Sequence, residues 1–186
     1  WISNASIRFA EQMQLLALSW YVATETGSPF LLGLFGALRF TGTLFGAAYG
    51  VVVDRSNRRR LMVGVRLSLA VMSAVVLLLV LAEQLEPWHI FVLTGFEGLA
   101  RTLDNINRQT VLADVVGREQ LINAMALDRS GADASQMAGP LVGGLLLSRL
   151  DMGPVFAVVV AVYLLAVVSA SLVHSTKPAA APWPPR

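Results

Sequence analysis

The sequence has 186 residues, of which 55% are hydrophobic and only 14% are charged, and its mean hydropathy is +0.64. Because soluble domains carry roughly 25% charged residues, this composition excludes a disordered chain, a nucleic-acid-binding domain and most soluble enzymes. The formal net charge is only +2 and there are no cysteines, so the sequence offers neither disulfides nor thiolate metal sites.

Apolar stretches long enough to cross a membrane, which takes about 20 residues, recur along the chain. They run from the start to about residue 24 and then over residues 30–53, 61–82, 88–113, 121–148 and 154–173. Short polar loops separate them, and the Pro/Ala-rich ending KPAAAPWPPR is typical of an extended linker. We therefore predict an all-α, polytopic membrane domain with six transmembrane helices over residues 1–173, followed by a cytoplasmic linker over residues 174–186.

The placement of basic residues predicts how these spans are oriented. The loop over residues 54–60 holds four arginines, whereas the loops that follow residues 24 and 82 have only glutamates as charged residues. Loops rich in Lys and Arg stay in the cytoplasm. Both ends of the chain are therefore predicted to be cytoplasmic.

Ionisable residues also occur within the predicted spans, where each charge costs at least ~2.5 kcal/mol. They are Arg8, Glu11, Arg39, Glu97, Arg101, Asp104, Arg108, Asp128, Arg129 and Asp133. Spacings of three or four residues place side chains on one helix face. These spacings predict the pairs Arg8–Glu11, Glu97–Arg101, Asp104–Arg108 and Arg129–Asp133. Such pairs are either purely structural or line a polar cavity.

Two of these residues, Arg39 and Asp128, have no partner at that spacing on their own helix. With a rise of ~1.5 Å per residue, Arg39 lies at about the same depth as Glu97 and Asp133. Arg39 is therefore predicted to meet one of those two carboxylates across helices. Asp128 lies closer to the cytoplasm, at the level of Arg8. The sequence thus predicts two polar layers.

Two motifs carry a resemblance to a known family. Residues 50–59, GVVVDRSNRR, resemble the G-x-x-x-D-R-x-x-R-R signature between the second and third helices of the major facilitator superfamily. Ser135, Gly139, Pro140, Gly143 and Gly144 resemble the G-x-x-x-G-P-x-x-G-G motif of its exporters, with Ser135 in place of the first glycine. Residues 12–14 (QMQ), 26–29 (TGSP) and 117–121 (GREQL) resemble the bacterial branch that contains enterobactin exporters and macrolide efflux proteins.

The resemblance implies that the chain is one half of a twelve-helix bundle, with its substrate site between this half and a second one that is absent here. It implies a secondary active transporter, namely a proton-coupled exporter of drug-like or siderophore-like molecules that works by alternating access. Its partners would be a small-molecule substrate, the lipid bilayer and the second half, with no nucleic acid. The proton gradient would supply energy without a cofactor, in a bacterial inner membrane.

The resemblance also assigns roles to individual residues. The cytoplasmic gate motif would be Gly50, Asp54, Arg55, Arg58 and Arg59. The first and fourth helices line the cavity in this superfamily, so polar residues there and nearby are candidates for the substrate or proton pathway. These candidates are Arg8, Glu11, Gln12, Arg39, Glu97, Arg101, Asp104 and Asp133. Pro140 and its neighbouring glycines would let the fifth helix bend.

Two alternatives stay open at this point. One is an importer of a small nutrient on the same fold, against which the motif over residues 135–144 argues. The other is a non-transporting scaffold or half-protein, against which the charged stripe of the fourth span argues. An enzyme is disfavoured, because the sequence shows no His/Cys/Asp metal cluster, no Ser-His-Asp set and no phosphate-binding loop.

Overall fold

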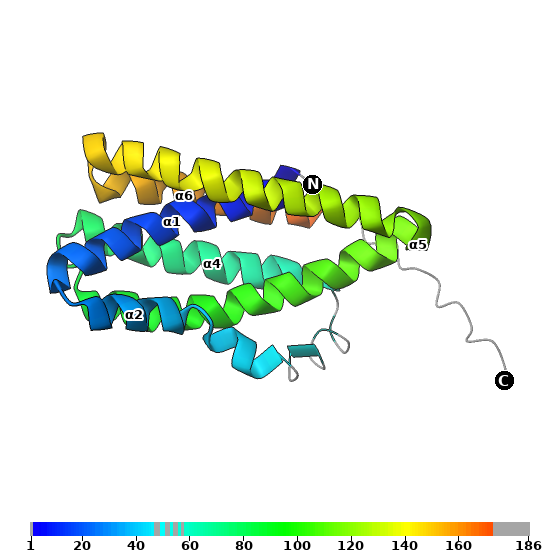
Figure 1. Ribbon diagram of the computed structural model, residues 1–186, viewed down its shortest axis with the longest axis horizontal. Coiled ribbons are helices and arrows are strands. Elements are labelled where there is room, and N and C mark those ends of the chain that lie inside the picture. Colours follow the sequence, from blue (N-terminus) through cyan, green and yellow to red (C-terminus); the bar gives the residue numbers. More distant parts are fainter. Residues whose placement is uncertain (1, 47–48, 51–52, 54–55, 57, 173–186) are drawn as a thin grey trace.

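The computed structural model describes residues 2–46, 49–50, 53, 56 and 58–172. In this part of the chain every regular element is helical. The elements are α1 (Ile2–Thr26), α2 (Pro29–Leu38), the 3₁₀ helix η1 (Thr41–Phe45), α4 (Arg58–Leu81), α5 (Pro87–Leu150) and α6 (Met152–Leu172). They lie along the long axis of the molecule (Figure 1). The all-α expectation is confirmed, and the predicted linker over residues 174–186 lies outside the described residues.

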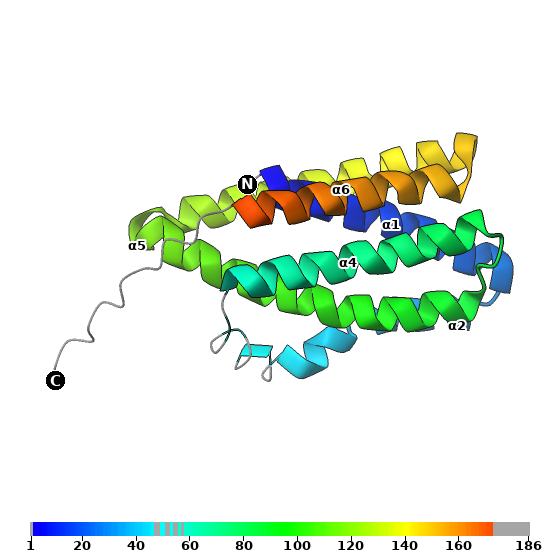
Figure 2. The same ribbon diagram turned by 180° about the vertical axis from the view of Figure 1, so that it is seen from behind.

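One helix, α5, takes the place of two predicted spans. The expected loop over residues 114–120 is helical, and α5 runs for 64 residues. A straight helix of that length would measure about 96 Å, but Figures 1 and 2 show α5 turning back on itself. Its first limb (residues 87–108) and second limb (residues 123–150) run in opposite directions on either side of α1. The predicted loop is wrong because that segment has no proline and contains strong helix formers.

The second predicted span, residues 30–53, is wrong as a single helix. α2 ends at Leu38, a turn follows over Arg39 and Phe40, and η1 begins at Thr41. The Thr41 hydroxyl donates to the Leu38 carbonyl oxygen (2.8 Å). Such side-chain bonds to the backbone compete with regular helix formation, and the chain tightens into a 3₁₀ turn.

Glycines in the second span differ in what surrounds them. A Cβ at Gly42 would overlap the Gly98 carbonyl oxygen and the Thr102 side chain, so η1 and the first limb of α5 meet backbone to backbone. Gly46 and Gly50 have no described atom within 4 Å of an added Cβ. Of these three glycines, only Gly42 makes the close contact that a small residue permits.

The second limb of α5 packs tightly against α1. A Cβ at Gly139 would lie 2.6 Å from the Gln12 Cβ, and one at Gly143 would lie 3.3 Å from the Met13 Cα. Met13 itself is fully buried. Glycines of the fifth predicted span thus permit a close helix contact, which places α1 at the centre of the helical array.

Capping residues mark where two helices begin. Gly27 adopts φ +56° after α1, and the Ser28 hydroxyl then accepts a hydrogen bond from the Leu31 N–H (3.4 Å). At the start of α5, the Glu86 N–H donates to His89 Nδ1 (3.1 Å). These side chains satisfy N-terminal groups that a helix leaves unpaired, and they fix the two short loops predicted from the sequence.

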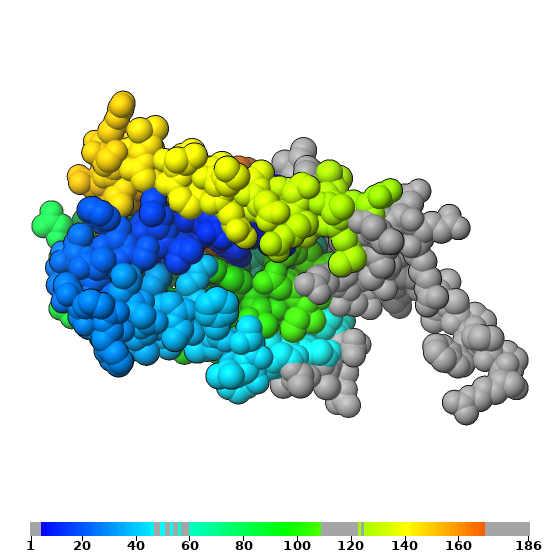
Figure 3. All heavy atoms as spheres, in the orientation of Figure 1, coloured from blue at the N-terminus to red at the C-terminus, as the bar shows by residue number. Residues whose placement is uncertain are grey.

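Two helix segments among the described residues are long and apolar enough to cross a membrane. They are Arg60–Leu81 and Met152–Ser169, each with a mean hydropathy of 2.4, and only 33% and 28% of their residues are buried inside the chain. Exposed large apolar side chains on these segments include Leu67, Val71, Leu78, Leu165 and Val168. On the face seen in Figure 3, α1 and the second limb of α5 lie side by side, and the first limb is visible between them and η1.

Candidate functional site

A buried chain of hydrogen bonds joins three helices at Glu97. The Ser73 hydroxyl of α4 donates to Gln14 Oε1 of α1 (3.0 Å), and Gln14 Nε2 donates to Glu97 Oε1 on the first limb of α5 (2.5 Å). All three side chains are almost fully buried. The Gln14 amide oxygen accepts the hydrogen bond from Ser73, and this orients the amide nitrogen of Gln14 toward the Glu97 carboxylate.

Gln14 was not among the residues predicted for the site, although it carries the contact to Glu97. The sequence held a usable signal, because Gln14 lies three residues after Glu11 and therefore shares a helix face with it. The predicted candidate Gln12 lies elsewhere, with its Cβ against Gly139.

A small cavity lies beside this hydrogen-bond chain. Arg39, Thr94 and Arg101 line it together with Gln14 and Glu97. Its volume of about 10 Å³ is close to what one water molecule needs. Within the described part of the chain, the buried Thr94 hydroxyl has no hydrogen-bond partner. Leu15, Leu18 and Phe35 complete much of the lining, so the cavity is partly polar, with two arginines among its lining residues.

Arg39 meets one of its two predicted partners in this cavity. It shares the lining with Glu97, whereas Asp133 lies in a different, exposed pair with Arg129. No carboxylate oxygen of the described residues lies within 4 Å of the Arg39 guanidinium. Arg39 is thus a cation near a carboxylate without a direct ion pair.

Arg101 makes its ion pair across helices. Its Nε lies 3.6 Å from Glu11 Oε1 of α1. The predicted pairing of Arg101 with Glu97 along α5 is wrong at ion-pair distance, although both residues line the cavity. The two helices pack closely enough that a neighbouring helix supplies a nearer partner. We call these residues the Glu97 cluster: Glu11, Gln14, Arg39, Ser73, Glu97 and Arg101.

A second buried group surrounds Asp104. Asp104 Oδ1 lies 3.7 Å from Arg66 Nε of α4, and the Arg66 guanidinium also donates to the Ala166 carbonyl oxygen of α6 (3.4 Å). The predicted pairing of Asp104 with Arg108 is wrong at ion-pair distance. Sequence analysis did not select Arg66, because an arginine near the start of a span also fits the rule for cytoplasmic ends.

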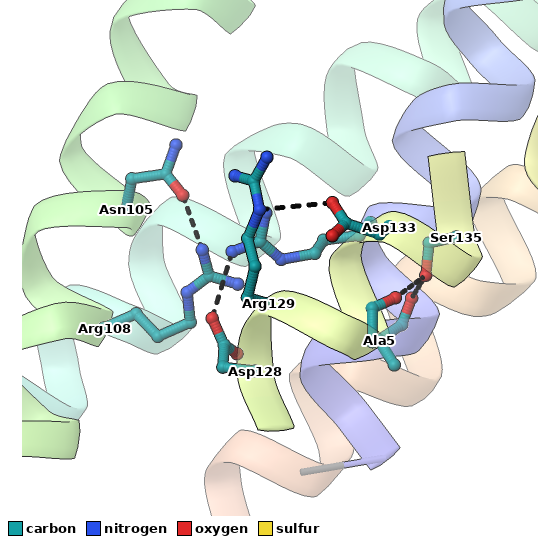
Figure 4. Close-up of polar contacts among 9 residues, drawn as sticks. Ala5, Asn105, Arg108, Asp128, Arg129, Asp133 and Ser135 are labelled. Carbon is teal, nitrogen blue, oxygen red and sulfur yellow. Dashed lines mark hydrogen bonds and ion pairs between the residues drawn. The ribbon is translucent and has the colours of Figure 1, made fainter. Parts of the chain in front are cut away.

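The same group extends across α1 to the second limb of α5. Arg8 Nη2 lies 3.2 Å from Asp128 Oδ2, so the predicted pairing of Arg8 with Glu11 is wrong. Buried Arg108 donates to Asn105 Oδ1 (2.6 Å), and Figure 4 shows its guanidinium pointing toward Asp128. We call these residues the Asp104 cluster: Arg8, Arg66, Asp104, Asn105, Arg108 and Asp128.

Of the pairs predicted within one helix, Arg129–Asp133 is present. Arg129 Nε lies 3.2 Å from Asp133 Oδ1, and both side chains are more than half exposed (Figure 4). Nearby, the Ser135 hydroxyl donates to the carbonyl oxygens of Gly131 (2.7 Å) and Ala5 (3.1 Å). Ser135 therefore ties the second limb of α5 to α1.

The remaining motif residues are placed as follows. Asp54 and Arg55 lie outside the described residues, as do the side chains of Arg58 and Arg59. Pro140 lies within α5, and a Cβ at Gly144 would contact the Leu16 side chain at 3.4 Å. Within the described ranges, no group of three or more His, Asp or Glu side chains is arranged to hold a metal ion.

Comparison with known proteins identifies the family of this chain. The family model described as Major Facilitator Superfamily matches residues 1–186. The chain belongs to the major facilitator superfamily. The resemblance to this superfamily is thereby confirmed, and the chain is a membrane protein of a transporter family.

Members of the superfamily with similar sequences include two macrolide efflux proteins A. The protein from Streptococcus pyogenes is 24% identical over 178 residues, which cover 95% of this chain and 44% of that protein. The protein from Enterococcus faecalis is 26% identical over 134 residues, which cover 71% of this chain and 41% of that protein. The chain thus spans less than half the length of these relatives.

Proposed function

We propose that this chain forms the six-helix half of a proton-coupled exporter of small molecules, which works by alternating access with a second six-helix half. The similarity to macrolide efflux proteins over 95% of the chain supports export and favours a drug-like substrate. In this superfamily the substrate lies between two such halves near the middle of the membrane. The proposed energy source is the proton gradient, with no cofactor.

The observation that carries this proposal is the Glu97 cluster. It gathers two arginines and two carboxylates among α1, α2 and the first limb of α5, of which Glu97 is buried and the other three are partly buried. Charges at membrane depth are costly, and proteins keep them mainly where they serve an ion, proton or substrate pathway. A scaffold would gain nothing from this arrangement, because apolar side chains would fill the same space at lower cost.

The proposed location is the bacterial inner membrane, with both ends of the chain in the cytoplasm. The outward-facing apolar surfaces of α4 and α6 support a bilayer environment. The four arginines of residues 54–60 support the orientation. The proposed linker over residues 174–186 would lead from this half to the second one.

The proposed gate is the motif of residues 50–59 on the cytoplasmic side. Asp54 would bind to a helix end or a cation of the second half, and release it when the cytoplasmic side opens. We expect Asp54→Asn to abolish transport while leaving membrane insertion unchanged, which immunoblotting of membranes and vesicle transport would measure together. A variant that transports at the full rate would exclude this gating role.

Transport itself can be tested in everted membrane vesicles from cells that produce the complete protein. Respiration acidifies the vesicle interior, so an exporter driven by protons should accumulate a radiolabelled macrolide there. A protonophore should discharge the accumulated label. Accumulation that survives the protonophore would contradict proton coupling, and no accumulation of any macrolide would contradict the substrate class.

A further inference from the structure

One carboxylate at membrane depth differs from all the others in its partners. Each of the other carboxylates in the described spans has an arginine nitrogen within 4 Å. The distances are 3.6 Å for Glu11, 3.7 Å for Asp104, 3.2 Å for Asp128 and 3.2 Å for Asp133. Glu97 has none, and its hydrogen-bond partner is the neutral amide of Gln14. Yet Glu97 is only 5% exposed.

We infer that Glu97 is the carboxylate that binds the transported proton. This inference rests on the proposed function and assigns its coupling step to one residue. A carboxylate held by an arginine gives up that ion pair when it takes a proton, whereas Glu97 exchanges only a hydrogen bond with an amide. Among the described carboxylates at membrane depth, Glu97 is therefore the one whose protonation breaks no ion pair.

Charged and titratable groups face Glu97 from several helices. They are Arg39 at the end of α2, Glu11 of α1, Arg101 of α5 and Tyr163 of α6, with Ser73 as the polar neighbour from α4. With Glu97 ionised, the two arginines and two carboxylates balance. When Glu97 binds a proton, one positive charge is left over.

That excess charge has a structural consequence at Arg39. The Arg39 guanidinium repels that of Arg101, and Glu97 offsets the repulsion only while it is ionised. Arg39 also forms no ion pair with another described residue, and it sits where α2 ends. Protonation of Glu97 should therefore drive the end of α2 away from the first limb of α5, which links the proton to a helix movement.

The proton balance of this step is simple. During export, one proton from the outer solution binds a Glu97 carboxylate oxygen, and the same proton later leaves to the cytoplasmic water. The polar cavity beside Glu97 has room for about one water molecule, which is enough to pass a proton to the carboxylate. Ser73 and Gln14 act as positioning residues that hold the carboxylate at the cavity wall.

Infrared difference spectroscopy of the purified complete protein can test this directly, without any transport. Titrating the protein should reveal a C=O band of a buried protonated carboxyl group. We expect the band to vanish in Glu97→Gln and to return, at a shifted frequency, in Glu97→Asp. The matched variant Asp104→Asn should keep it. A band that persists in Glu97→Gln, or that disappears in Asp104→Asn, would overturn the inference.

A transport experiment separates this inference from the proposed function. In proteoliposomes, Glu97→Gln should still exchange labelled for unlabelled macrolide across the membrane, but should lose accumulation driven by a pH gradient. Glu83→Gln, an exposed carboxylate in the loop before α5, serves as the control and should retain both. If Glu97→Gln accumulates macrolide like the unaltered protein, Glu97 is not the proton site. If the infrared band depends on Glu97 but no macrolide moves in any variant, the proposed substrate fails while the proton site stands.

Discussion

The Glu97 cluster and the Asp104 cluster are built from the same kinds of residue but are held in different ways. In the Asp104 cluster each carboxylate contacts an arginine of another helix, at 3.7 Å for Asp104 and 3.2 Å for Asp128. In the Glu97 cluster the central carboxylate contacts an amide, and Arg39 has no carboxylate within ion-pair distance among the described residues. The ion pairs of the Asp104 cluster connect helices. The Glu97 carboxylate, in contrast, can take or lose a proton without breaking an ion pair.

This difference shows that burial alone does not identify a functional residue of a membrane protein. Arg66 and Glu97 are both almost fully buried. Removing one partner of a buried ion pair strands the other, so such pairs are difficult to open during a transport cycle. A buried carboxylate with a neutral hydrogen-bond partner can gain and lose a proton without breaking an ion pair, although at Glu97 the proton leaves the two facing arginines with one carboxylate fewer.

The largest expected effect comes from breaking the Asp104 cluster. Arg66→Ala should lower the free energy of unfolding by about 3–5 kcal/mol, because it leaves Asp104 buried without its cation. Thermal or denaturant unfolding of the detergent-purified protein measures this loss. The double variant Arg66→Ala/Asp104→Ala should be more stable than the sum of the two single changes predicts. Simple additivity would show that the two side chains are not coupled.

A smaller effect is expected at the backbone contact between η1 and the first limb of α5. Gly42→Ala should cost about 1–3 kcal/mol of stability, because its Cβ has no space against the Gly98 backbone. Gly46→Ala is the matched control, since its Cβ meets no described atom within 4 Å, and it should be neutral or slightly stabilising. Equal losses in the two variants would contradict the close contact at Gly42.

The Glu97 cluster itself should tolerate loss of its charge. Glu97→Gln breaks no ion pair among the described residues, so the loss should comprise the altered hydrogen bond, about 0.5–1.5 kcal/mol, and the Arg39–Arg101 repulsion that Glu97 no longer offsets. Asp104→Asn, measured under the same conditions, should lower the free energy of unfolding by more, because it leaves the Arg66 guanidinium without its carboxylate partner. If Glu97→Gln proves the more damaging of the two, the contrast between the clusters is wrong.

The smallest effect should come from the exposed pair on the second limb of α5. Arg129→Gln should change stability by less than about 1 kcal/mol, because exposed ion pairs contribute little. Both side chains of the Arg129–Asp133 pair are more than half exposed. A loss as large as that of Arg66→Ala would mean that this surface is covered in the assembled protein.

Much of the fold follows from the sequence by simple physics. Apolar length located the helices, and Ser28 and Pro87 marked two of the loops. The break after Leu38 escaped prediction because hydropathy does not register a threonine hydroxyl that bonds to the backbone. The helical connection between the two limbs of α5 was not predicted, because polar residues such as Arg118 and Glu119 occur in loops as well as in helices.

The sequence predicted most of the charged residues of the site, but not which of them contact one another. Spacing along a helix correctly gave the exposed pair Arg129–Asp133. It failed for Arg8, Arg101 and Asp104, because helices that pack against each other bring a partner from elsewhere in the chain closer than the one four residues away. Neutral residues such as Gln14 and Ser73 carry no charge pattern, so only the packing of α1 against α4 and α5 reveals them.

The central position of α1 also has a consequence for how the protein is made. Arg8 meets Asp128, which is 120 residues later in the chain, and Ala5 meets Ser135, which is 130 residues later. At a synthesis rate of about 5–20 residues per second, α1 waits roughly 6–24 s before these partners exist. During that interval Arg8 and Glu11 lack the α5 residues that they contact in the folded chain, so α1 should hold its place in the bilayer poorly until α5 has followed. Although α1 precedes the other described helices in the chain, it is therefore among the last of them to be secured.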